Sequence, residues 1–363
     1  MSNTATVLAF DFGASSGRAI RAVYDGQNLT YEEIHRFENV PIEKDGHLCW
    51  DVETLLKEIH TAIQKAGTFD SLGFDTWGVD FGLLDADGHL LANPVHYRDA
   101  RTNGKPEQAA ACMPAEELYA HTGNQIMAIN TLFQLLALQE QEPELLQKAE
   151  QILFMPDLFA ALLGAEPVCE RSIASTSQML DPRTGQWSRE VLTAYGLKEN
   201  HFAPLVASGT VTGTLTTGAK IIAVAGHDTQ CASAAMPCAE EDAEHTAFLS
   251  CGTWSLLGTE LDAPILTADS CQSGLSNELG ANGKINYLKN IIGLWLIQES
   301  RREYKRRGQA YSFAELEQQA LAAEPLRSFI DPDAPEFVAP GDLPGRIQEF
   351  CRKTGQPVPE TVG

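Results

Sequence analysis

Hydrophobic and polar positions alternate in a pattern that predicts two similar hairpins, far apart in the chain. Residues 7–10 form an apolar run that ends on Asp11, a turn of small residues spans Gly13 to Gly17, and residues 18–24 predict a second strand. The range 247–258 repeats this design, with an apolar run, a small polar turn at 250–253 and another apolar run. We therefore expect two related domains that each bring a donor-lined turn to one phosphate chain.

The segments between the hairpins predict an α/β domain. A third strand at 29–37 continues an antiparallel meander, and a helix is expected over 52–66 with Asp51 as its N-cap. Further strands are expected at 71–76, 79–85, 90–96 and 221–225, edge strands within 209–218, and helices at 106–111, 131–141, 143–149 and 157–163. Three strands, a helix and further strands is the order of a ribonuclease-H-like domain, whose parallel strands need helical crossovers.

The C-terminal part predicts fewer strands. A short helix is expected from Cys231, with Asp228 or Thr229 as its N-cap, and the acidic stretch 240–244 marks a boundary between domains at 1–243 and 244–363. Residues 289–307 and 312–323 each predict one helix, and the chain is proline-rich from Asp331 onward. No set of buried parallel strands follows the second hairpin, so the second domain is expected to be incomplete.

Composition narrows the class of partner. The 363 residues carry a net charge of −23, which argues against nucleic acid or an anionic membrane as a partner but permits a nucleotide held by a few donors and Mg²⁺. The eight cysteines lack C-x-x-C spacing and predict reduced thiols in a cytoplasmic protein. No apolar stretch approaches the roughly 20 residues that span a bilayer. Residues 301–307 are basic and predict a solvated helix face, and the oligomer is expected to be a monomer or a homodimer.

Acidic residues at the ends of predicted strands are the candidate metal-binding and catalytic groups. Glycines at 13 and 17 permit a positive φ or a close backbone approach, and Asp11 would repel a phosphate there unless a cation sits between them. Asp228 follows the buried strand 221–225, where ligands bind in open α/β sheets, so its carboxylate could take a proton from a substrate hydroxyl. The alternative is a helix cap with His227 as its polar neighbour.

Two further segments can each be interpreted in two ways. Residues 74–80 contain Asp75, Trp77 and Gly78, which predict either a polyol pocket or a hairpin with a core tryptophan. The charges of residues 97–102 are interpreted as ion pairs that hold a loop rather than as substrate contacts.

Seven segments resemble those of the FGGY carbohydrate kinases. They are D-F-G-A-S-S-G-R (11–18), E-I-H-R-F (33–37), D-T-W-G-V-D-F (75–81), Y-R-D-A-R-T-N-G (97–104), G-H-D-T (226–229), S-C-G-T-W-S-L (250–256) and L-K-N-I-I-G-L-W-L-I-Q (288–298). The resemblance implies an actin-like fold of two ribonuclease-H-like domains with a cleft between them. It also implies ATP- and Mg²⁺-dependent phosphorylation of the 1-hydroxyl of a ketose, with L-rhamnulose expected and L-fuculose as the related alternative.

The resemblance also implies roles for individual residues. Asp228 would be the catalytic base, and Asp11 would act through the metal. Sugar contacts are implied for Gly78, His227, Thr229 and Asn290, and nucleotide contacts for Ala14, Ser15, Ser16, Gly17, Arg18, Thr253 and Gln298. The later motifs of the family, including the turn that holds adenine and ribose, have no counterpart, so we expect this chain to keep the sugar site but to bind ATP weakly.

Two other classes remain open. One is a non-catalytic sugar-binding relic of a kinase, and the other is an actin-like ATPase such as a chaperone, whose partner would be a protein. The polar segments at Trp77–Gly78 and His227–Asp228 favour a small-polyol site over the chaperone.

Overall fold

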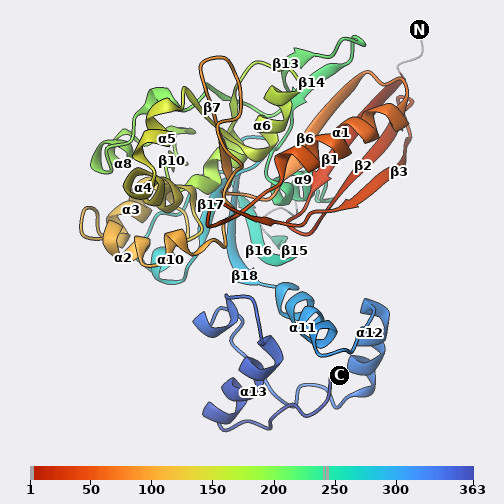
Figure 1. Ribbon diagram of the computed structural model, residues 1–363, viewed down its shortest axis with the longest axis vertical. Coiled ribbons are helices and arrows are strands. Elements are labelled where there is room, and N and C mark those ends of the chain that lie inside the picture. Colours follow the sequence, from red (N-terminus) through yellow and green to blue (C-terminus); the bar gives the residue numbers. More distant parts are fainter. Residues whose placement is uncertain (1–3, 240–241, 243–244) are drawn as a thin grey trace. The chain divides into compact units, whose positions relative to one another are not determined.

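The computed structural model describes residues 4–239, 242 and 245–363 (Figure 1). The chain forms two compact units. The first runs to Phe248 and includes Gly258–Lys289, and the second consists of Leu249–Leu257 and Asn290–Gly363. The predicted boundary between residues 243 and 244 falls outside the described residues, so the domain limits stay a prediction.

A six-stranded sheet forms the centre of the first unit. Its strand order is β13-β14-β6-β1-β2-β3, with bounds Thr210–Thr214, Lys220–Ala223, Ser71–Thr76, Ala5–Phe12, Ser16–Tyr24 and Leu29–Glu38. Strands β1, β2 and β3 are antiparallel neighbours, whereas β1 is parallel to β6 and β6 is parallel to β14. The predicted meander and its ribonuclease-H-like order are confirmed.

Strand β1 has one face that is buried in the core and one face that is open to solvent. Leu8, Phe10 and Phe12 are fully buried, and the rings of Phe10 and Phe74 stack with centroids 4.8 Å apart. Side chains alternate across a strand, so Ala9 and Asp11 lie on the other face. Ala9 is exposed there, although β1 is a central strand. The carboxylate of Asp11 therefore projects from the side of the sheet that is open.

Helices form where apolar spacing predicts them. Helix α1 (Val52–Ala66) has the predicted bounds, and the Asp51 carboxylate accepts a hydrogen bond from the Thr54 amide at its start. Figure 1 shows α1 lying along the sheet, where it contacts β2 and β3. The other helices up to the end of the predicted first domain are α2 (Lys105–Ala109), α3 (Ala115–Thr122), α4 (Thr131–Gln141), α5 (Pro143–Lys148), α6 (Met155–Leu162), α7 (Arg171–Ala174), α8 (Arg189–Ala194) and α9 (Asp228–Ala234).

Short strands complete this part of the first unit, and one predicted strand is wrong. The short strands are β4 (Ile42–Lys44), β5 (His47–Cys49), β7 (Phe81–Leu84), β8 (Gln151–Phe154), β9 (Cys169–Glu170), β10 (Leu180–Asp181), β11 (Gln186–Trp187) and β12 (Leu205–Val206). The range 90–96 forms no named strand, and its ladder contacts are the isolated bridges Leu84–Leu90 and Cys49–Val95. Pro94 has no N–H to donate, which interrupts a continuous ladder.

The chain beyond residue 247 has four strands and four helices among the described residues. Strands β15 (Phe248–Cys251), β16 (Trp254–Leu261), β18 (Ile285–Ile292) and β17 (Ser276–Leu279) are neighbours in that order, and α10 (Ala268–Gln272) precedes β17. The single helix predicted over 289–307 is wrong, because 289–292 finish β18 and α11 (Trp295–Arg306) begins later. Gly293 separates them, and a Cβ there would overlap Ser255.

The remaining helices agree with the pattern except at the C-terminus. Helix α12 (Phe313–Ala322) starts with a capping box between Ser312 and Glu315, inside the predicted range 312–323. Helix α13 (Leu343–Lys353) lies in the proline-rich region, where no helix was expected; its first residue, Leu343, is fully buried in one cluster with Phe337. Pro344 sits in its first turn, where proline is tolerated.

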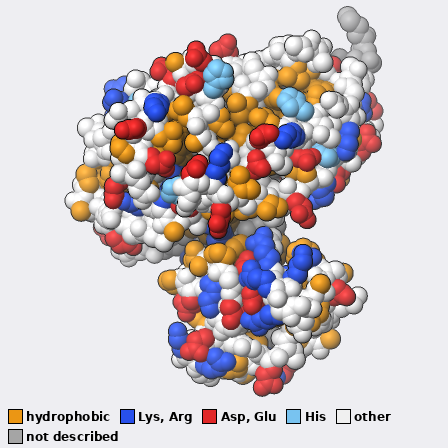
Figure 2. Space-filling view, in the orientation of Figure 1, with side chains coloured by type: hydrophobic (Ala, Val, Ile, Leu, Met, Phe, Trp, Pro, Cys, Tyr) orange, Lys and Arg blue, Asp and Glu red, His pale blue; other side chains and the backbone are white. Residues whose placement is uncertain are grey.

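The basic residues of α11 form ion pairs within the second unit. Arg302 and Arg306 contact the buried carboxylate of Glu299 at 3.2 and 2.8 Å, and Arg307 contacts Glu303 at 2.7 Å. Figure 2 shows blue side chains gathered in this region. Their exposed positions confirm the interpretation as a solvated helix face.

Candidate active site

Three neighbouring parallel strands bring acidic residues together at their carboxyl ends. Asp11 of β1 lies directly opposite Asp75 of β6 in the strand register. Thr76 then bridges to His227, and the Thr76 N–H donates to the Gly226 carbonyl at 2.8 Å. Ligands bind at this edge in open α/β sheets, so the topology makes the segment from Gly226 to Thr229 part of one candidate site with Asp11 and Asp75.

Asp228 is the first residue of α9 and not its cap. The N-cap position belongs to His227, so the prediction that Asp228 or Thr229 caps this helix is wrong. The Asp228 Oδ1 accepts a hydrogen bond from the Thr229 amide at 2.6 Å, and the side chain keeps 37% of its surface exposed. A carboxylate that is anchored on one oxygen and accessible to solvent has the geometry that a general base needs.

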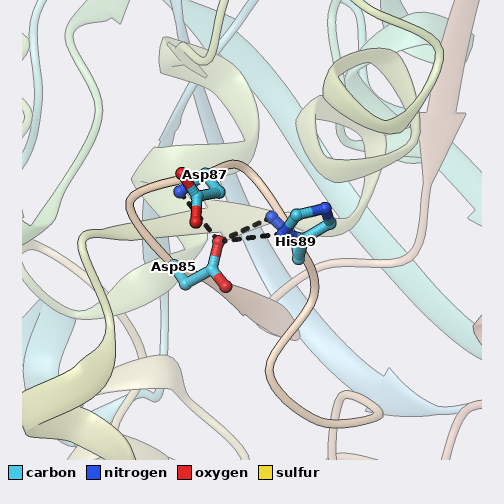
Figure 3. A group of neighbouring side chains, drawn as sticks. All are labelled: Asp85, Asp87 and His89. Carbon is cyan, nitrogen blue, oxygen red and sulfur yellow. Dashed lines mark hydrogen bonds and ion pairs between the residues drawn. The ribbon is translucent and has the colours of Figure 1, made fainter.

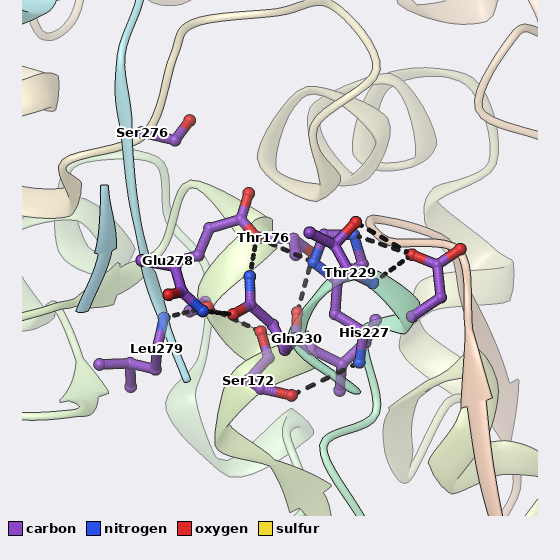
Figure 4. A network of polar contacts seen from close by, with 12 residues as sticks. Ser172, Thr176, His227, Thr229, Gln230, Ser276, Glu278 and Leu279 are labelled. Atoms are coloured by element: carbon purple, nitrogen blue, oxygen red, sulfur yellow. Dashed lines mark hydrogen bonds and ion pairs between the residues drawn. The ribbon is translucent and has the colours of Figure 1, made fainter. Parts of the chain in front are cut away.

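His227 lies between two carboxylates. Its Nδ1 is 2.8 Å from Glu278 Oε2, and its Nε2 is 3.5 Å from Asp228 Oδ1 (Figure 4). Burial of the imidazole disfavours its charge, but the ion pair and hydrogen bond with Glu278 outweigh burial and raise the pKa of His227 to about 9. At neutral pH the ring is therefore an imidazolium with both nitrogens available as donors.

The neighbouring carboxyl groups hold their protons more tightly than free aspartates. Burial raises the pKa of Asp75 well above its ordinary value, and the charges of Asp11 and Asp228 add to this effect. Burial also raises the pKa of Asp228, but the charge of His227 opposes the rise. The site thus combines one carboxyl that favours its protonated form with one that His227 helps to keep ionised, a separation typical of catalytic acids and bases.

Glu170 anchors the loop that carries His227, and the sequence did not mark it. Its side chain is buried, and Oε2 accepts hydrogen bonds from the Gly226 amide at 2.9 Å and from the amides of Ser172 and Ile173 at 2.9 and 3.2 Å. Oε1 accepts from the Ser208 hydroxyl at 2.6 Å. A glutamate with no neighbouring motif carries no local signal of such a role, because its partners come from distant segments.

The first turn is held by backbone contacts and by one buried asparagine. The Gly13 amide donates to the Ser16 carbonyl at 2.9 Å, and the Asn39 side chain donates to the Gly13 carbonyl at 3.0 Å. Neither glycine of the turn has a positive φ, so that part of the expectation is wrong. Gly17 is required by space, since a Cβ there would overlap the ring of Phe37.

Arg18 faces Asp11 across the β1–β2 register. Its Nε and Nη2 lie 2.7 and 2.6 Å from Asp11 Oδ2, and both side chains are partly exposed. Arg18 thus pairs with Asp11 within the chain. A hydrogen-bonded pair this exposed contributes little to stability, and the metal expected at Asp11 stays a prediction.

The loop around Gly78 is strained and closely packed. Val79 has φ +66°, an unusual value for a β-branched residue, and its amide donates to the Thr176 hydroxyl at 3.1 Å. Trp77 is buried, and its indole N–H donates to the buried Asp80 carboxylate at 3.0 Å. Trp77 and Asp80 therefore belong to the core, and the strain concentrates beside Gly78. Strain of this kind is found most often at functional sites.

Residues 97–102 hold a loop, as interpreted from their charges. Asp99 accepts hydrogen bonds from the Leu48 and Arg101 amides at 2.8 and 2.9 Å and contacts His47 Nδ1 at 3.1 Å. These contacts attach the segment to β5 and give the Asp99 carboxylate a structural role.

Two of the remaining candidates meet in the second unit. The Thr253 hydroxyl lies 3.3 Å from Gln298 Oε1, and the Leu294 and Trp295 amides at the start of α11 donate to the Gly252 and Thr253 carbonyls, both at 3.0 Å. Asn290 lies on β18 in the same unit. The second turn is thus tied to the first turn of α11, and the sequence motifs 250–256 and 288–298 form one local structure.

Two groups of acidic side chains offer oxygen atoms to a metal ion. Within the described ranges, one group brings three candidate ligand atoms within 4.8 Å of one another, namely Asp85, Asp87 and His89 (Figure 3). Asp85 Oδ1 accepts from the Asp87 and His89 amides at 2.9 and 2.8 Å, so its carboxylate serves the turn. The Asp11 site offers oxygen donors on an open face, which suits Mg²⁺ because this ion keeps several waters and binds through one or two carboxylates plus substrate phosphates.

Comparison with known proteins places the chain in a family. Residues 6–234 match the N-terminal domain of the FGGY family of carbohydrate kinases, and residues 247–363 match its C-terminal domain. The chain belongs to the FGGY family of carbohydrate kinases. Among curated FGGY relatives, it is 42% identical to the rhamnulokinase of Bacteroides thetaiotaomicron over 369 residues, which covers 98% of this chain and 75% of that protein. It is 40% identical to the rhamnulokinase of Enterococcus faecalis, which covers 99% of this chain and 74% of the relative.

Solved structures of other FGGY kinases share the fold. Ligand-bound xylulose kinase from Lactobacillus acidophilus aligns with a TM-score of 0.71 at 16% identity, covering 88% of this chain and 66% of that one. Glycerol kinase from Plasmodium falciparum, solved with ADP, aligns with a TM-score of 0.66 at 14% identity, with the same coverage of the two chains. The expected actin-like, ribonuclease-H-like fold is confirmed. Among the described helices, none is both long and apolar enough to cross a bilayer.

Proposed function

We propose that this chain is a ketose kinase that transfers the terminal phosphoryl group of ATP to the 1-hydroxyl of L-rhamnulose. The observation that carries the proposal is the placement of Asp228, which is accessible, anchored by the Thr229 amide and faced by protonated His227. Two curated relatives at about 40% identity over almost the whole chain bear the name rhamnulokinase and support the choice of sugar. L-Fuculose is the related alternative.

Each residue then has a defined task. Asp228 accepts the proton of the 1-hydroxyl while that oxygen forms a bond to the terminal phosphorus, and the bond from this phosphorus to the departing ADP breaks. His227 and Thr229 hold the sugar beside Asp228, and Gly78 permits its close approach; Asn290 is proposed as a further sugar contact.

The phosphate chain is held mainly by backbone and hydroxyl donors. Residues 14–18 are proposed to offer such donors to the nucleotide, and Thr253 and Gln298 are proposed as further nucleotide contacts. Asp11 would hold Mg²⁺, which supplies charge neutralisation when bound. Arg18, which pairs with Asp11 in this structure, would then be available to the phosphates.

The cellular setting follows from this activity. We propose a cytoplasmic enzyme, a monomer or homodimer, whose partners are a sugar and a nucleotide rather than nucleic acid or membrane. The net charge of −23 supports this assignment.

A sugar panel combined with Asp228→Asn tests the proposal. ADP release is followed by a coupled assay with L-rhamnulose and L-fuculose, and sugar binding is measured by calorimetry. We expect L-rhamnulose to be preferred, and Asp228→Asn to lower kcat by about 10²- to 10⁴-fold while sugar affinity changes little. Glu32→Gln, which changes an exposed carboxylate by the same chemistry, serves as the control. An Asp228→Asn variant with undiminished turnover would remove Asp228 from the mechanism.

A second candidate function is a non-catalytic sugar-binding protein. Sugar binding without phosphorylation, at any ATP concentration, would support this candidate, and turnover with L-rhamnulose and ATP would exclude it.

A further inference from the structure

A buried glutamate on β17 controls the ring that faces Asp228. Glu278 lies 51 residues along the chain from His227, and its side chain is buried, with 4% exposed. Its Oε2 contacts both His227 Nδ1 and Gln230 Nε2 at 2.8 Å (Figure 4). Nothing in the motifs assigns it a role.

The hydrogen-bond directions around Glu278 are determined by its neighbours. Asn286, opposite Glu278 in the β17–β18 register, donates its side-chain amide to Gln230 Oε1 and to the Ser233 hydroxyl. Since Gln230 Oε1 accepts, its Nε2 must be the atom that donates to Glu278. Glu278 Oε2 therefore acts as an acceptor, and its buried negative charge requires a cation beside it.

That cation is His227, whose other nitrogen faces Asp228 at 3.5 Å. We propose that Glu278 is a positioning residue, which fixes the His227 ring and keeps both of its nitrogens protonated so that the Nε2–H stays directed toward Asp228 and the sugar. The ring cannot turn without losing the Glu278 contact, so its orientation is set before any ligand arrives.

Several charged groups act on the His227 ring or on its neighbour Asp228. The acidic ones are Glu278 on β17, Asp75 on β6 and Asp11 on β1. Arg18 on β2 is already paired with Asp11. Burial works against the imidazolium, and Glu278 is the largest favourable influence on it. Without Glu278 the ring would hold its proton less tightly.

This inference rests on the proposed function only where it concerns the sugar. As an imidazolium, His227 donates a charged hydrogen bond to a sugar oxygen, and such bonds are the stronger kind. As a neutral ring with its proton on Nδ1, it would present an acceptor to the same oxygen. Sugar affinity is therefore expected to stay constant up to about pH 9, where His227 loses its proton.

Histidine NMR on the complete chain tests the state of the ring directly. With ring-labelled histidine, the His227 signal is identified by its loss in His227→Gln, and its titration is compared in the unsubstituted chain and in Glu278→Gln. We expect the unsubstituted ring to titrate near pH 9 and the variant ring to titrate about 1 to 3 pH units lower. At pH 8 we expect Glu278→Gln to bind L-rhamnulose about tenfold to a hundredfold more weakly.

Control variants separate the possible outcomes. Glu58→Gln removes the same charge beside another histidine, His35, and should leave the His227 signal unchanged. Glu278→Asp keeps the charge and should restore most of the raised pKa; it also serves if Glu278→Gln does not fold. A His227 signal that titrates below pH 7 in the unsubstituted chain overturns the proposal, as does a Glu278→Gln titration that matches it. Because NMR reads the ring itself, failure here is distinct from failure of the kinase assay.

Discussion

Replacing Glu170 by alanine should loosen the loop that carries His227 and Asp228. The substitution removes the acceptor of three buried amides, those of Ser172, Ile173 and Gly226, and of the Ser208 hydroxyl. Each buried donor left without a partner costs about 1–3 kcal/mol. Water entering the vacated space restores part of this loss, so we expect a local cost of about 3–5 kcal/mol, in the range found when one member of a buried charged network is removed.

Glu170→Gln is the matched variant of the same shape. Its carbonyl oxygen can accept from the three amides, and its NH₂ can donate to Ser208, whose hydroxyl then accepts. Only the extra strength of charge-assisted bonds is lost, which we expect to cost about 1 kcal/mol. The pair of variants thus separates the loss of acceptors from the loss of charge.

Hydrogen exchange measures this cost locally, which matters because a chain with two units does not unfold in one step. Mass spectrometry of peptides covering 170–176 and 223–228 should show exchange about 10²- to 10³-fold faster in Glu170→Ala, since each 1.4 kcal/mol is a factor of ten. Glu170→Gln should accelerate exchange by less than about tenfold, and the exposed control Glu53→Ala should not change it. Unchanged exchange in Glu170→Ala would refute the assignment of Glu170 as the anchor of this loop.

Two other predictions concern stability. Because the folded-state pKa of His227 is about 9 against an ordinary value of 6.5, its contribution of about 3 kcal/mol is fully present below pH 6.5 and disappears as pH rises through 9; urea unfolding of the first unit between pH 6 and 10 should show this loss, and a flat profile would contradict it. Gly17→Ala should destabilise the first hairpin by about 1–3 kcal/mol because its Cβ meets the ring of Phe37, whereas Gly13→Ala meets only the Ser16 carbonyl at 3.3 Å; thermal unfolding checks this, and equal melting temperatures for the two variants would count against it.

Local sequence patterns predict a helix or strand of this fold well where the residues of that element alone determine its conformation. The bounds of α1 and α4 agree with helical spacing, and β1–β3 agree with apolar alternation between turn residues. The errors occur where tertiary contacts override the local pattern. Residues 289–292 have helix-compatible spacing but finish a strand because β18 pairs with β17, and 90–96 is interrupted at Pro94.

The sequence predicts only those residues of the candidate site that directly follow a predicted strand. Asp11 and Asp228 follow apolar runs, so their place at the sheet edge follows from the sequence, whereas the Asp11–Arg18 pair was not predicted and comes from the strand register. Glu170 and Glu278 carry no such signal, since their partners are brought to them by other segments. The positive φ of Val79 is likewise invisible to a pattern that treats valine as a strand residue.

Two cations of the chain itself prepare this acidic edge before any ligand binds. Three aspartates at neighbouring strand ends repel one another, and each unbalanced charge in a partly buried site would drive a proton onto a carboxyl group. Arg18 balances Asp11 from an exposed position and can leave, whereas His227 is locked in place by Glu278 and cannot. The difference matches the tasks proposed for the two acids: Asp11 would exchange its partner when metal and phosphate bind, while Asp228 must stay ionised until it takes the proton of the sugar hydroxyl.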